Sequence, residues 1–186
     1  MLKPVLRNRL LVVIGASLPL VMATPAVAAP PAARNFVAHL TSAEEVPPAG
    51  VTIDCPCQGQ AIFKLSKDGT ELSYRLIASN IDNVTAAHIH LGPAGANGGV
   101  VLFLYGSAPA AGGPQNGGLS EGTASAANLT GALLGQSLSV LVDAMATGGA
   151  YVNVHTNDGV APTNTGCGDF PGGEIRGQIQ TAGPKQ

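Results

Sequence analysis

Short segments in which apolar and polar residues alternate are the feature that most constrains this fold. Residues 59–66 and 71–78 both alternate in this way, and Asp68-Gly69 between them has the composition of a tight hairpin turn. Because successive side chains of a strand point to opposite faces, one face of each segment is apolar. We therefore predict an antiparallel hairpin that buries Ala61, Phe63, Leu65, Leu72, Tyr74 and Leu76.

Other segments also have the character of strands, and turns rich in glycine and proline separate them. The chain has 25 glycines, 14 prolines and no tryptophan, which fits many short strands better than a helix bundle. Residues 107–118 are expected to form a loop, and 100–105 (VVLFLY) a strand buried on both faces. The remaining strands are predicted over residues 35–41, 84–91, 151–156 and 173–179, with a weak one over 122–130.

One helix is predicted, near residue 140. Ser137 is a suitable N-cap and Gly148 follows the last apolar position. The apolar residues between them recur at the spacing of one helix face, at Leu138, Leu141, Val142 and Met145. Strands and helix together predict an all-β fold: an immunoglobulin-like or Greek-key sandwich or barrel with one short helix.

The first residues have the pattern of a secretion signal. Lys3, Arg7 and Arg9 precede an apolar run over 10–22, and Ala26-Val27-Ala28 resembles a cleavage site. The run is shorter than the roughly 20 residues that a membrane span needs. We therefore expect an exported protein, secreted or periplasmic, with no membrane span after cleavage. Its predicted parts are a signal peptide over 1–28, a loose leader over 29–34, a β domain over 35–180 and a polar tail over 181–186.

The charge of the exported part excludes one class of partner. Three of the nine lysines and arginines lie in residues 1–28, which leaves six basic against eleven acidic side chains and a net charge of −5. Domains that bind nucleic acid carry a basic patch instead. We expect no nucleic-acid partner, and an extracellular partner whose identity the sequence does not reveal.

Three cysteines are present in a chain that we expect to enter an oxidising compartment. Such compartments favour disulfides, and a bond between Cys55 and Cys57 would close a strained small ring. We therefore expect Cys167 to pair with one of these two, with the choice left open. The alternative interpretation makes Cys55-Pro56-Cys57 a metal or redox site.

The histidines suggest a metal site. His88 and His90 share one face of their predicted strand, and His155 lies on the polar face of another. Three imidazoles can bind Cu(II) or Zn(II), with water, Glu174 or His39 as a fourth ligand. If these strands are neighbours, their polar faces form one surface patch, which comprises His88, His90, Asn153, His155, Glu174, Arg176 and Gln178.

Simpler interpretations of these polar residues exist. The histidines can brace strand ends by hydrogen bonds to loop backbone, and Glu174 and Arg176 can form a surface ion pair. In the metal-site interpretation, Asn153, Arg176 and Gln178 support the ligands. Glu44 and Glu45 are expected in a solvated turn. No pattern of a hydrolase or a phosphate-binding loop is found, so we expect no catalytic residue.

Four blocks of the sequence resemble the CHRD domain, a family named for its copies in chordin and also found in secreted microbial proteins. The blocks are residues 40–48 (LTSAEEVPP), 87–95 (AHIHLGPAG), 151–156 (YVNVHT) and 172–179 (GGEIRGQI). The resemblance extends from about residue 35 to residue 180. It implies an all-β, immunoglobulin-like or barrel domain outside the cytoplasm. The function that we expect is a binding module rather than an enzyme.

A fainter resemblance is to copper/zinc superoxide dismutase. That family has an H-x-H strand on the outer wall of a barrel, a further histidine, a disulfide and an arginine near its end. His88, His90, His155, Cys167 and Arg176 are similar in kind and order, whereas the ligands of a zinc subsite are missing. The alternatives to the binding module are therefore a dismutase-like redox enzyme and a metal-free structural or adhesive domain.

Overall fold

The structure is a computed structural model that describes residues 34–183. The predicted signal peptide, most of the predicted leader, and residues 184–186 of the predicted tail lie outside the described residues. Within this range, no helix has the length and apolar character that crossing a membrane requires.

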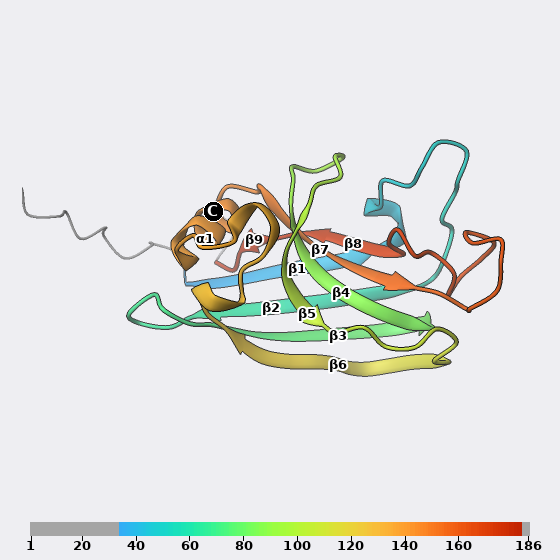
Figure 1. The fold of residues 1–186 in the computed structure, drawn as a ribbon, viewed down its shortest axis with the longest axis horizontal. Helices are drawn as coiled ribbons and strands as arrows, with labels where there is room; N and C mark the ends of the chain where they lie inside the picture. Colours follow the sequence, from blue (N-terminus) through green and yellow to red (C-terminus); the bar gives the residue numbers. More distant parts are fainter. Residues whose placement is uncertain (1–33, 184–186) are drawn as a thin grey trace, which may run out of the picture.

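The strands form a single antiparallel sheet in the order β5-β4-β7-β8-β1-β2-β3-β6, and β9 pairs with β1 (Figure 1). They are β1 (Asn35–Thr41), β2 (Gln58–Leu65), β3 (Leu72–Asp82), β4 (Val84–Leu91), β5 (Val100–Tyr105), β6 (Pro114–Ala124), β7 (Ala150–Thr156), β8 (Ile175–Gln178) and β9 (Gln180–Thr181).

The sheet curls into a nearly closed barrel. Its edge strands are β5 and β6, and the hydroxyl of Tyr74 on β3 donates a hydrogen bond to the carbonyl of Leu104 on β5 at 3.1 Å. The interior is filled by one face of each strand, including Phe36, Phe63 and Leu76, which are at most 1% exposed. The predicted all-β class is confirmed, and so is the hairpin, whose strands β2 and β3 pair Phe63 with Tyr74. Its predicted apolar residues are buried except Tyr74, which is only partly buried.

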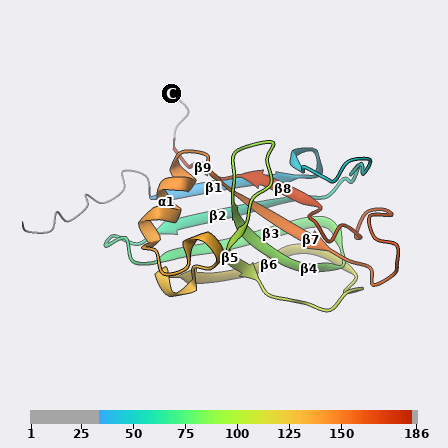
Figure 2. The same ribbon diagram turned by 45° about the horizontal axis from the view of Figure 1, so that its top comes forward.

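The predicted helix is α1 (Leu138–Ala146), and its four predicted apolar residues are all buried. Ser137 occupies the N-cap position, but its hydroxyl contacts Ser139 instead of capping the helix. Figures 1 and 2 show α1 at one end of the barrel, opposite the loops 42–57 and 157–174. Three short 3-10 helices complete the elements: η1 (Ser42–Glu44), η2 (Ala126–Asn128) and η3 (Gly131–Leu133).

The two edge strands differ from the prediction. The expected loop is confirmed over 107–113 only, because 114–124 form β6, which pairs with β3 through backbone hydrogen bonds. The weak strand predicted over 122–130 coincides with the end of β6 at Ala124 and does not continue beyond it. A sequence rich in glycine, with a proline as its first residue, is compatible with an edge strand because backbone groups alone form the pairing. Phe103 is 53% exposed, so β5 is not buried on both faces. Its outer face lacks a covering layer at the edge of the barrel.

Three loops cover the outer face of β4, β7 and β8: residues 42–57, 92–99 and 157–174. The Asn97 side-chain amide donates to the Val46 carbonyl at 2.7 Å, which joins the first two loops. The Asn83 side-chain amide donates to the Gly168 carbonyl at 3.3 Å and attaches the third to the barrel. The barrel therefore has a second layer over the strands that carry the histidines.

Candidate functional site

Strands β4, β7 and β8 place the predicted polar residues on one face. The sheet pairs His88 with Asn153, and Asn153 with Arg176. The opposite faces of the same strands point into the barrel, where Ile89 and Val152 are fully buried. The strand pairing thus brings together every residue of the predicted polar set except Glu174, which precedes β8.

This polar face is covered and is not the surface patch that we expected. Arg176 is 1% exposed, Asn153 2% and His90 7%, because the three loops fold over them. His88 and His155 are half-buried. Among the described residues, solvent therefore reaches the histidines mainly from the side of His88 and His155.

Three imidazoles converge on this face. The ligand nitrogens of His88, His90 and His155 lie within 4.8 Å of one another, and we call these residues the histidine cluster. The ring of His88 is 5.7 Å from that of His90 and 4.9 Å from that of His155. Nδ1 of His88 and Nε2 of His155 are 3.1 Å apart. One ion with bonds of about 2 Å can reach rings in this arrangement after small rotations.

Backbone carbonyls fix the protonation of two rings. Nδ1 of His90 is 2.9 Å from the Gly98 carbonyl, and Nδ1 of His155 is 3.1 Å from the Pro171 carbonyl. A carbonyl only accepts, so each Nδ1 carries the proton and each Nε2 presents a lone pair. Nε2 of His90 is buried and has no hydrogen-bond partner among the described residues. Metal-binding histidines are typically oriented by this kind of carbonyl contact.

Burial keeps the three rings neutral. Desolvation, followed by the proximity of His155 and His90, lowers the pKa of His88 to about 4. Desolvation and His90 lower the pKa of His155 to about 4, against the opposing effect of the Pro171 carbonyl. The pKa of His90 is also lowered, mainly by desolvation. Neutral imidazole is the form that binds metals, so the cluster is ready for a cation at neutral pH.

Neither protein residue suggested as a fourth ligand lies in the histidine cluster. Glu174 is fully buried and belongs to a separate group with Cys55 and Cys167. His39 is exposed on β1, opposite Gln60 of β2. Among the residues described, the histidine cluster thus offers three protein ligands, and water can supply the fourth.

Arg176 reaches the histidine cluster through Tyr151 and not by direct contact. The guanidinium of Arg176 lies 3.4 Å from the ring centroid of Tyr151, and that ring stacks on His90 at 5.0 Å. Arg176 donates to the carbonyls of Pro93 and Ala96 and to the side chain of Asn97, at 2.9 to 3.1 Å. It thus anchors the loop that supplies Gly98. The structure shows these contacts in place of the expected surface ion pair with Glu174.

Gln178 braces the opposite end of the same face. Its amide nitrogen lies 2.7 to 2.9 Å from the carbonyls of Gly92, Gly148 and Ala150. These contacts hold the end of β4 against the start of β7. They tie backbone to backbone and do not involve an imidazole ring.

The sequence did not predict that the Glu45 side chain is covered. Glu44 is exposed as expected, but Glu45 is largely covered and its Oε1 has no partner among the described residues. Desolvation raises its pKa to about 7, although the nearby Arg176 and Asn153 oppose this shift. The only sequence signal was the Val46-Pro47-Pro48 segment that follows, which turns the loop back over the barrel.

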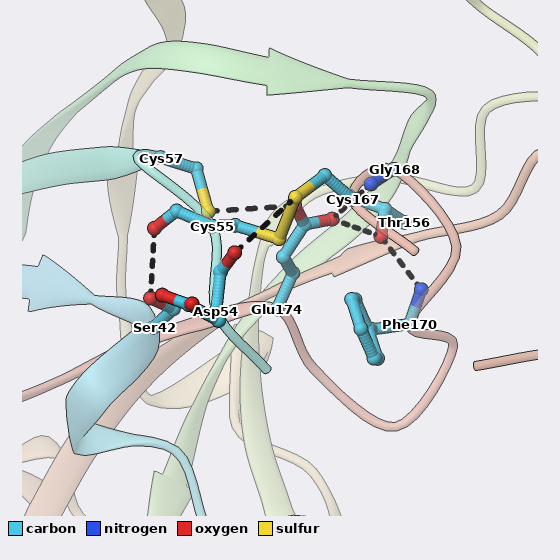
Figure 3. The surroundings of a disulfide bond; sticks show 9 residues. All are labelled: Ser42, Asp54, Cys55, Cys57, Thr156, Cys167, Gly168, Phe170 and Glu174. Atoms are coloured by element: carbon cyan, nitrogen blue, oxygen red, sulfur yellow. Dashed lines mark hydrogen bonds between the residues drawn. A yellow bond between two sulfur atoms is a disulfide. The ribbon is translucent and has the colours of Figure 1, made fainter. Parts of the chain in front are cut away.

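The disulfide joins Cys167 to Cys55, with Cα atoms 5.7 Å apart, and links the loops 42–57 and 157–174 (Figure 3). Of the two partners left open by the sequence, the structure thus selects Cys55. Cys57 is a buried free thiol whose Sγ is 3.4 Å from Oε1 of Glu174. Desolvation and the Glu174 carboxylate raise the pKa of this thiol to about 12.

The four blocks that carry the sequence resemblance all meet around this covered face. A family model described as the CHRD domain matches residues 36–179. No curated protein and no solved structure matches the chain significantly. The comparisons give no support to the resemblance to copper/zinc superoxide dismutase.

Proposed function

We propose that this chain, a member of the CHRD domain family, is an extracytoplasmic binding module that takes one copper or zinc ion at His88, His90 and His155. The observation that carries the proposal is the convergence of three neutral imidazoles within 4.8 Å. The Cys55–Cys167 disulfide supports an oxidising compartment, secreted or periplasmic.

The unsatisfied nitrogen of His90 favours a metal over a purely bracing role. Bracing accounts for the two Nδ1 protons, which bond to Gly98 and Pro171. It leaves Nε2 of His90 buried without a partner in the part of the chain that the structure describes, at a cost of about 1–3 kcal/mol. A cation in the histidine cluster satisfies this lone pair, whereas Nε2 of His155 already lies 3.1 Å from Nδ1 of His88 and can accept a hydrogen bond from it.

The donor set favours a borderline cation. Imidazole nitrogens suit copper and zinc, and Cu(II) binds more tightly than Zn(II) at most nitrogen sites. His88 and His155 are half-buried, so a water or a small anion can reach the ion from their side. Three neutral ligands leave the full charge of the ion in place.

Calorimetric titration of the purified protein with Cu(II) and with Zn(II) tests this proposal. We expect one tight equivalent, which is lost in the His88→Ala/His90→Ala variant. His39→Ala is the matched control, because His39 is exposed and outside the histidine cluster. Circular dichroism establishes that each variant is folded, and His88→Asn is a milder substitution should the double variant unfold.

The same experiment separates the alternatives. Superoxide turnover by the copper-loaded protein would make it a redox enzyme, whereas copper binding without turnover supports the binding module. Failure of the wild type to bind either metal would overturn both metal functions and leave a structural or adhesive domain.

A further inference from the structure

A second group of ligand atoms surrounds the carboxylate of Glu174. The Sγ atoms of Cys55 and Cys167 and a carboxylate oxygen of Glu174 lie within 4.8 Å of one another. Cys57 adds a third sulfur, 3.4 Å from Oε1 of Glu174. Figure 3 shows the Cys57 thiol and the disulfide directed toward the same carboxylate. We call Cys55, Cys57, Cys167 and Glu174 the sulfur cluster.

Glu174 lies in an environment that favours a cation. The residue is fully buried. Its partners in the described part of the chain are neutral donors: the Thr156 hydroxyl, the Gly168 amide and the Cys57 thiol. Buried carboxylates are normally paired with a cationic side chain or a metal. A cation placed between this carboxylate and the nearby sulfurs would supply the missing positive charge.

The backbone on both sides of the disulfide is held by contacts other than the disulfide. The Ser42 hydroxyl donates to the Cys55 carbonyl at 2.9 Å, and β2 begins directly after Cys57. On the other loop, the Gly168 amide donates to Oε2 of Glu174 at 2.9 Å, and the Phe170 amide donates to the Thr156 hydroxyl at 2.9 Å. These anchors keep the three cysteines near Glu174 when the S–S bond is open.

The chemistry of this set differs from that of the histidine cluster. Three thiolates and one carboxylate form a four-coordinate site for Zn(II), and thiolates also select other soft cations. Cys167 is exposed, so a reductant can reach the disulfide from solvent. Cys57 and Cys55 are buried, so an ion held there is shielded from water.

We propose that reduction of the Cys55–Cys167 disulfide converts the sulfur cluster into a zinc site whose ligands are Cys55, Cys57, Cys167 and Glu174. A dithiol reductant supplies two electrons and two protons. The S–S bond breaks, Cys55 and Cys167 become thiols, and the reductant becomes a disulfide. Zn(II) then binds the three sulfurs as thiolates and one oxygen of Glu174, and three protons pass to solvent. The ion replaces the disulfide as the link between the two loops.

Titration with Co(II) tests this site, because thiolate ligands give intense near-ultraviolet charge-transfer bands that imidazole ligands do not. We compare the oxidised protein with protein reduced by a phosphine that carries no thiol. The reduced protein is expected to show the bands with one equivalent of Co(II), and Zn(II) is expected to abolish them. The oxidised protein is expected to show none.

Variants assign the ligands. Cys57→Ser is expected to weaken Co(II) and Zn(II) binding to the reduced protein at least about tenfold, and Glu174→Gln to weaken it as well. Asp54→Asn is the control, because this exposed side chain is next to Cys55 in sequence but outside the cluster.

Two outcomes overturn the proposal. The first is that reduced protein shows no thiolate bands with Co(II). This result counts against the site whether circular dichroism shows the reduced protein to be folded or unfolded. The second is an unchanged spectrum and affinity in Cys57→Ser. Because the bands report sulfur alone, these results do not depend on whether the histidine cluster binds metal.

Discussion

The histidine cluster lies beneath the loops 42–57 and 157–174, whereas the cysteines of the sulfur cluster belong to these loops, and different forces hold the two clusters in place. The histidines are on β4 and β7, where strand pairing fixes their spacing. The cysteines come from two loops, and a covalent bond joins Cys55 to Cys167 across a sequence separation of 112. Strand pairing presents the histidines without any cross-link, whereas a disulfide or an ion adds a direct link between two loops that hydrogen bonds otherwise anchor separately. The first cluster is therefore preformed and the second depends on its redox state.

The largest effect is expected from removing the disulfide. In Cys55→Ala/Cys167→Ala, the free energy of unfolding should fall by about 4 kcal/mol, since the bond closes a long loop in the unfolded chain. Cys57→Ala, which removes a buried thiol outside the bond, should cost about 1 kcal/mol. Urea denaturation measures both values. Copper binding should survive in both variants if the strands alone hold the histidine cluster, and its loss would contradict this distinction.

A somewhat smaller effect is expected from Arg176→Ala, which disturbs the histidine cluster without altering a histidine. The change leaves the Pro93 and Ala96 carbonyls without their donor, which should cost about 3 kcal/mol. Copper affinity should fall about tenfold, because the loop that presents Gly98 to His90 is loosened. Denaturation and calorimetry measure the two effects. Arg75→Ala, at an exposed position, should change stability by less than about 0.5 kcal/mol.

A more modest effect is expected from Glu45→Gln. The Glu45 pKa is about 7 in the folded chain against an ordinary value of 4.5, so the folded chain binds more protons between these pH values. The free energy of unfolding should therefore fall as the pH rises through this window. At pH 8 the variant should be about 1–2 kcal/mol more stable than the wild type. Glu44→Gln, at the exposed neighbouring residue, should show no such gain in thermal unfolding.

The smallest effect is expected on lowering the pH from 7 to 5 in a copper titration. Because the pKa values of His88 and His155 are about 4, copper affinity should weaken less than about tenfold over this range and steeply below it. Ordinary imidazoles would lose far more. The metal-free fold should lose stability between pH 6.5 and 4, where the unfolded chain takes up protons first. A steep loss of copper affinity already at pH 6 would contradict the burial of the rings.

The sequence predicted the strands that carry the histidines because their alternation is strict. Residues 84–91 and 151–156 form β4 and β7 as expected, and the helix lies where its apolar spacing placed it. The strand β6 was missed because its glycine-rich sequence has no alternation, and its pairing with β3 is made by the backbone. The pattern of apolar and polar residues does not predict a pairing that backbone groups alone form.

The sequence also did not predict that loops cover the site. Asn153 and Arg176 look like surface residues in a strand with one polar face, and only the three loops bury them. Glu45 looks like part of a solvated turn, and only its place beneath the loop raises its pKa to about 7. Burial depends on segments distant in the chain, which local pattern does not specify.

The sequence by itself determined which side chains share a face, because alternation in a strand is a local property of the backbone. It also determined the family, through four separate blocks. Only the tertiary structure decided that His155 meets the His88 and His90 pair, that Cys167 bonds Cys55, and that Glu174 joins the sulfurs. Those outcomes depend on strand order and loop path, which are set by the packing of the whole barrel.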